Sequence, residues 1–126
     1  MHIVLGRAAL RLRAVAAVRA PLRAAAAGRP LIIDFFAVRT RGPSIGDLIV
    51  GFDEARLGPA FVEVAPVGDV PVLVERRLVP ILARGATLVP RPRWWPFGSP
   101  VWIRLRHPED WLGFLDGRPA STDRRS

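Results

Sequence analysis

The sequence contains no cysteine, lysine, asparagine, glutamine or tyrosine. Without cysteine, the chain can form no disulfide, supplies no thiolate to zinc or to an iron–sulfur cluster, and has no cysteine nucleophile. All 19 positions that count as lysine or arginine hold arginine. Together with the missing residue types, this indicates a GC-rich coding bias more than selection for guanidinium chemistry.

Long apolar runs are also missing. The longest uncharged stretch, residues 94–103, includes two prolines and has about half the length of the ~20-residue helix that crosses a bilayer. The arginine-free apolar runs near the N-terminus are shorter than the roughly 7–15 residues of an export signal, and residues 1–33 lack the serine and threonine of a transit peptide. We therefore expect a soluble, cytoplasmic protein without a membrane span.

The net charge of +8 is unevenly distributed. Residues 1–33 hold six arginines and no acid, whereas residues 34–126 hold 13 arginines and 11 acids. A basic arm of this kind is typical of proteins that bind nucleic acid, anionic surfaces or acidic partners. If the arm is helical, however, Arg13 lies nearly opposite Arg7 and Arg11, so the wheel defines no single basic face.

The residue patterns predict one domain, because 126 residues of which 50% are apolar suffice for one core. Ten alanines between Arg7 and Ala27 favour a helix, which Pro21 should kink or split and Gly28 should end. β-Branched and aromatic residues predict the strands, at residues 31–38, 48–52, 61–65, 70–75, 86–89 and 101–106.

Turn-forming residues refine this outline. Pro66–Asp69 should join two of the strands into a hairpin, a helical turn should begin at Pro80, and a short helix should begin at Pro108 and stop at Gly117. The expected organisation is a helical segment over residues 1–30 packed on a β core over 31–106, a short helix over 107–117, and a disordered tail over 118–126. The predicted fold class is α+β.

A first candidate for chemistry is Gly42-Pro-Ser-Ile-Gly46, which matches the G-x-S-x-G turn of serine hydrolases. That turn requires a strand before it and a helix after it, whereas Asp47–Phe52 has the composition of a strand. A triad would also need His107 to reach Ser44. The pattern is better explained as a turn, and we predict that the chain is not an enzyme.

Two further clusters have both a chemical and a structural explanation. His107 with Glu109 and Asp110 could ligate a divalent metal, but proline and acids at a helix start are explained by capping alone. Arginines interleaved with aromatics suit stacking on bases beside phosphate contacts, although such tryptophans more often close a core; this cluster comprises Arg91, Arg93, Trp94, Trp95 and Phe97.

The order of the predicted elements resembles the HesB-like family of A-type iron–sulfur carriers. The closest correspondence is residues 61–89, FVEVAPVGDVPVLVERRLVPILARGATLV, which is similar to the family's VEVDGVPVLVD hairpin, its short LPYLEG turn and the strand that follows. The resemblance implies a compact, mainly β sandwich with an N-terminal helix alongside, and it implies oligomeric carriers.

The chain departs from the family at its cluster ligands. Pro43 most nearly occupies the position of the first ligand cysteine, and where the family's C-terminal Cys-Gly-Cys belongs, His107 is the sole conventional nitrogen ligand. We therefore expect no bound metal or cofactor. The resemblance implies a non-enzymatic relative of cluster carriers that acts through protein contacts, with an iron–sulfur assembly protein or a second copy of the chain as partner.

Arg39, Arg41 and Ser44 would line the altered loop and are the expected contact surface for such a partner. The alternative function belongs to a different class: a basic module that binds nucleic acid or an anionic surface. It would use the arginine arm together with Arg91, Arg93, Trp94 and Trp95. Salt dependence separates the two, because polyanion binding weakens steeply as salt rises.

Overall fold

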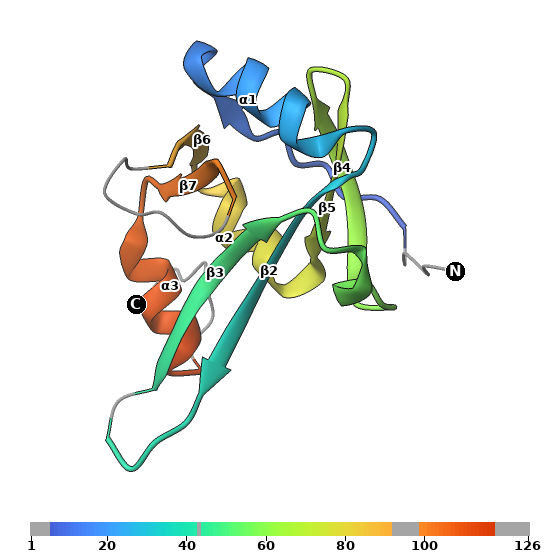
Figure 1. Ribbon diagram of the computed structural model, residues 1–126. Helices are drawn as coiled ribbons and strands as arrows, with labels where there is room; N and C mark the ends of the chain where they lie inside the picture. Colours follow the sequence, from blue (N-terminus) through green and yellow to red (C-terminus); the bar gives the residue numbers. More distant parts are fainter. Residues whose placement is uncertain (1–5, 43, 92–98, 118–126) are drawn as a thin grey trace.

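The computed structural model describes residues 6–42, 44–91 and 99–117 of the chain. These residues form a mixed, mainly β fold with three α-helices and seven strands in two sheets (Figure 1). In chain order the elements are β1 (Arg13–Ala14), α1 (Ala16–Ala26), β2 (Leu31–Val38), β3 (Ile45–Gly51), β4 (Phe61–Val67), β5 (Val70–Glu75), α2 (Val79–Ala83), β6 (Ala86–Pro90), β7 (Val101–Leu105) and α3 (Pro108–Leu115).

The larger sheet has the strand order β3-β2-β5-β4. Two antiparallel pairs, β2 with β3 and β4 with β5, are joined by the parallel pairing of β2 with β5. The predicted hairpin between β4 and β5 is confirmed, and its turn contains Gly68 at φ +61°, a conformation that glycine adopts without strain. β4 extends to Val67, beyond the predicted end, with a register shift between Val64 and Val67.

The smaller sheet has the order β1-β6-β7, in which β6 pairs in parallel with β1 and antiparallel with β7. Residues before β1 also bond to the larger sheet. The Ala8 N–H donates to the Glu63 carbonyl at 2.9 Å, and the Ala65 N–H donates to the Leu10 carbonyl at 3.0 Å. The N-terminal segment therefore runs between β4 and β6 and joins the two sheets.

The prediction of a helix from Arg7 was wrong, because α1 begins only at Ala16. In the preceding segment Leu10 and Leu12 are buried while Arg11 is exposed, which is the alternation of a strand. Hydrogen bonds to both sheets and burial of the two leucines outweigh the helix propensity of alanine here. Pro21 does not split the helix, which is continuous to Ala26 and ends as predicted, with Gly28 at φ +84°.

The core lies between the two sheets and α1. The inward residues of α1, Val18, Leu22 and Ala26, are almost fully buried, as are Leu31 of β2 and Leu88 of β6. At the other end, α3 packs against one face of the β2–β3 hairpin: the Phe35 ring contacts Phe114 and Trp111, with centroids 5.0 Å and 5.8 Å away. No helix within the described ranges combines the length and the apolar character needed to cross a membrane.

Candidate functional site

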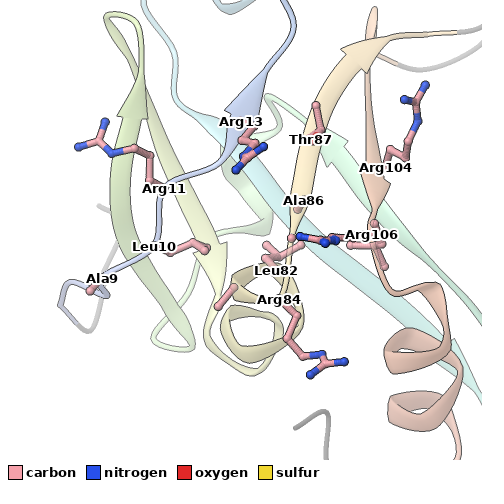
Figure 2. A pocket seen from close by; sticks show the side chains of 13 residues that line it. Ala9, Leu10, Arg11, Arg13, Leu82, Arg84, Ala86, Thr87, Arg104 and Arg106 are labelled. Atoms are coloured by element: carbon pink, nitrogen blue, oxygen red, sulfur yellow. The ribbon is translucent and has the colours of Figure 1, made fainter.

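A cleft of about 500 Å³ opens where the N-terminal segment, the end of α2, β6 and β7 meet (Figure 2). Thirteen residues line it. Five of them are arginines and none of the described lining residues is an acid; the arginines are Arg11, Arg13, Arg84, Arg104 and Arg106. We call this site the arginine cleft.

Sheet register places four of these arginines in two rows. Thr87 of β6 pairs with Arg13 on one side and with Arg104 on the other. Residues paired across strands project from the same face of a sheet, and so do residues two apart along a strand. Arg11 and Arg106 therefore lie on the face that carries Arg13 and Arg104, on either side of β6.

The opposite face of the small sheet determines this orientation. Leu12, Leu88 and Ile103 alternate with the cleft residues and are buried in the core. A shift of register by one residue would bring the arginines into the core and expose these apolar side chains. Because the apolar side chains of each alternating segment are buried, the arginines between them project from the exposed face.

Gly85 makes room for one arginine. Its φ is +128°, and a Cβ built on it would lie 2.8 Å from Cβ and 3.1 Å from Cδ of Arg106. The Arg106 N–H donates to the Gly85 carbonyl at 2.9 Å. The Arg106 stem therefore lies against the bare backbone at Gly85, in space that any other residue would occupy.

The arginine side chains point in two directions. In Figure 2 the guanidinium groups of Arg13 and Arg106 point into the cleft from its two sides, whereas Arg11, Arg84 and Arg104 point outward around its margin. We refer to Arg13 and Arg106 as the interior pair and to the other three as the rim arginines.

The charges of the cleft are mostly uncompensated. Arg84 forms an ion pair with Asp110, with Nε 2.5 Å from Oδ2, whereas the interior pair, Arg11 and Arg104 form no ion pair with any carboxylate of the described residues. Two like charges that converge in a concave site favour an anion between them. Guanidinium groups bind phosphate and carboxylate through paired, charge-assisted hydrogen bonds.

The expected contact residues lie elsewhere, in the turn between β2 and β3. Arg39 and Arg41 are exposed and Ser44 is half-buried. The Gly42 N–H donates to the Thr40 hydroxyl at 3.1 Å; Pro43 lies outside the described residues. Ser44 is followed by strand β3, as predicted, and not by the helix that a nucleophile turn requires, although the strand begins at Ile45 and not at the predicted residue 48.

The carboxylates near His107 do not converge on it. His107 Nδ1 lies 3.2 Å from Glu109 Oε2, while Asp110 pairs with Arg84. A hydrogen bond from its own backbone N–H at the start of α3, followed by the bond with His107, lowers the pKa of the Glu109 carboxyl. In the part of the chain that the structure describes, no group of three or more His, Cys, Asp and Glu residues could hold a metal ion.

The arginine-tryptophan cluster is described only at its edge. Arg93, Trp94, Trp95 and Phe97 lie outside the described residues. The half-buried Arg91 donates its backbone N–H to the Pro100 carbonyl at 2.9 Å. This bond brings together the two ends of the connection between β6 and β7.

Sequence reasoning did not single out the arginine cleft. Its signal is present, because leucine and arginine alternate over residues 10–13, and a similar alternation covers residues 102–106. The helix expected from Arg7 placed Arg11 and Arg13 on different faces, whereas in an extended segment the same spacing puts them on one face. The parallel pairing that brings Arg13 beside Thr87 has no local sequence signal.

No protein-family model, curated protein or solved structure matches this chain.

Proposed function

We propose that the chain is a non-enzymatic nucleic-acid-binding module whose arginine cleft contacts the phosphate backbone. The observation that carries this proposal is the interior pair, Arg13 and Arg106, which converges in an open cleft without a described carboxylate partner. This function is the alternative that the basic composition suggested, a module that binds nucleic acid or an anionic surface. The proposal moves the contact from a helical arm to the face of the small sheet.

The number and placement of the charges favour nucleic acid over other anions. Four cleft arginines form no ion pair with a carboxylate of the described residues. Their total positive charge is larger than the negative charge of a single phosphate, so the ligand should carry several negative charges. A planar layer of lipid headgroups reaches the rim of a concave site more readily than its interior. The described lining includes one hydroxyl, on Thr87, and no histidine or carboxylate, which suits binding better than acid–base catalysis.

Fluorescence anisotropy with labelled single-stranded and duplex DNA tests this proposal. We expect the full chain to bind at least one of them, with affinity falling steeply between about 50 and 200 mM salt as counterions are released. Arg13→Ala/Arg106→Ala should weaken binding by about tenfold or more, because a hydrogen bond to a charged group contributes about 1.5–3 kcal/mol.

The matched control is Arg39→Ala/Arg41→Ala, which removes the same charge from the β2–β3 turn. Equal losses from the two double variants would mean that net charge alone attracts the DNA, and the cleft would then have no special role. Tight binding to vesicles rich in anionic lipid, without binding to either DNA, would identify a membrane surface as the ligand and contradict the proposal.

As a second candidate function we propose the one that the family resemblance implies. In this proposal the chain is a relative of iron–sulfur carriers that lacks the cluster ligands and acts through protein contacts. It is supported by exposed apolar side chains beside Arg39 and Arg41. Phe36, Val38 and Ile45 project from the same face of β2 and β3 and are 48%, 53% and 57% exposed. Such neighbouring exposed apolar residues are typical of protein-binding surfaces. Substitutions here should weaken protein contacts and leave DNA binding unchanged.

A further inference from the structure

The face of the small sheet that carries the arginines continues into an apolar row. Two residues beyond the row of Arg13, Thr87 and Arg104, the same register places Val89 beside Trp102. Trp102 is 40% exposed and Val89 is buried. An indole therefore lies on the same sheet face, two residues along β7 from Arg104.

An aromatic side chain beside arginines suits unpaired bases. Bases stack on exposed aromatic rings while guanidinium groups meet the phosphates, and such stacking tolerates any base sequence. In a duplex the bases are already stacked on one another, so an indole on a sheet face gains no base contact without unstacking them.

The two orientations of the arginines also distinguish the ligands. A duplex is a stiff rod with a persistence length of about 50 nm, so it would rest on the margin of the cleft, near Arg11 and Arg104. A single strand is flexible enough to enter the cleft and bring adjacent phosphates to Arg13 and Arg106. The interior pair is therefore accessible mainly to a single strand.

From these observations we infer that the nucleic acid is single-stranded, with one base stacked on Trp102 and adjacent phosphates held by the interior pair. This inference rests on the proposed function and specifies its ligand. It also predicts separate effects for the arginines: the interior pair serves the single strand, while Arg11 and Arg104 on the rim contribute to any polyanion.

The test compares one labelled DNA sequence of about 12 nucleotides, within the usual site sizes of about 4–16 nucleotides, as a single strand and as a blunt duplex. We expect the single strand to bind the full chain at least about tenfold more tightly than the duplex. Trp102→Ala should weaken single-strand binding by about tenfold, since stacking on one aromatic contributes that order of affinity. Trp102→Phe should restore most of this loss, and neither variant should change duplex binding.

Repeating the titrations at several salt concentrations separates the contribution of base stacking to affinity from that of the charged contacts. The Arg13→Ala/Arg106→Ala variant should lower the magnitude of the salt slope by about 1.4, because each phosphate contact contributes about 0.7 for a single strand. Trp102→Ala should leave the slope unchanged. Circular dichroism of each variant verifies its fold, and the comparison of single strand with duplex in the original chain still tests the inference if the alanine variant does not fold.

Two results would overturn the inference while leaving the proposed function intact: duplex binding as tight as single-strand binding, or single-strand binding that is the same in Trp102→Phe, Trp102→Ala and the original chain. Failure of both DNA forms to bind would instead contradict the proposed function itself.

Discussion

The arginine cleft and the turn of the β2–β3 hairpin both present arginines to solvent, but only in the cleft does strand pairing fix where the arginines lie relative to one another. In the cleft, pairing across β6 places Arg13 and Arg104 on either side of Thr87. In the hairpin, Arg39 and Arg41 lie beyond the last paired residues, Val38 and Ile45. The comparison shows that strand register, and not the number of basic residues, gathers the arginines around one cleft.

The two regions also differ in what surrounds the charge. The walls of the cleft are built on a sheet whose other face is buried, so burial of that face specifies the register that forms the rows. The hairpin packs one face on α3 and leaves Phe36 and Val38 of the other face exposed. This difference is the basis for proposing anion binding at the cleft and protein contact at the hairpin.

The largest expected effect concerns the hairpin glycine, Gly46. A Cβ at this position would overlap the Phe36 carbonyl oxygen and lie 2.7 Å from Leu115 Cδ2, so Gly46→Ala should force β3 away from β2 and α3. We expect a loss of about 1–3 kcal/mol in the free energy of unfolding, measured by urea denaturation.

Gly51→Ala is the matched control in the same strand, because a Cβ there meets nothing within 4 Å. Equal unfolding midpoints for the two variants would show that the hairpin and α3 are not packed as described. DNA binding by the folded Gly46→Ala protein should remain normal, since the cleft lies on the other sheet.

A smaller effect on stability, but a specific effect on binding, is expected for Gly85→Ala in the cleft. The positive φ costs about 1–2 kcal/mol for any residue with a Cβ, and the new methyl group displaces the Arg106 stem. Titration with labelled single-stranded DNA should show an affinity several-fold weaker than that of the original chain.

Gly28→Ala separates these two causes. Gly28 has φ +84°, yet a Cβ there meets nothing within 4 Å, so this variant should lose comparable stability and bind DNA normally. If Gly28→Ala and Gly85→Ala weaken DNA binding equally, Arg106 is not positioned by the glycine.

The smallest effect on stability is expected at the exposed hairpin face. Phe36→Ser should change the free energy of unfolding by no more than about 0.5 kcal/mol, while lowering any concentration-dependent association of the chain in sedimentation velocity. Leu112→Ser, at an exposed apolar position on α3, is the control. Association that is unchanged by Phe36→Ser, or reduced equally by both variants, would argue against a self-contact at the hairpin.

Most of the elements could be predicted because their signals are local. β2 and β5 match the predicted ranges, and α3 begins at Pro108 as expected. The residues before Ala16 were wrongly predicted to be helical, because alanine propensity and the alternation of Leu10 and Leu12 favour opposite structures. Pairing with β4 and β6 decides between them, and both strands lie far along the chain.

The candidate site was less accessible than the fold. Arg39 and Arg41 could be placed in a loop from the sequence, but no local pattern shows that Arg13 and Arg106, 93 positions apart, converge in one cleft. The HesB-like resemblance stays a prediction about ancestry and partners. It did not point to the cleft, whose arginines are not part of the family's ligand pattern.

By itself, the sequence determined the absence of thiol chemistry, the excess of arginine and the positions of most strands, because composition and local pattern depend on no distant contact. Tertiary structure alone decided that part of the basic arm is extended and that its arginines share one open face with those of β7. The physical reason is the pairing of β1 with β6, which connects residues far apart in the chain and turns a diffuse positive charge into a cleft.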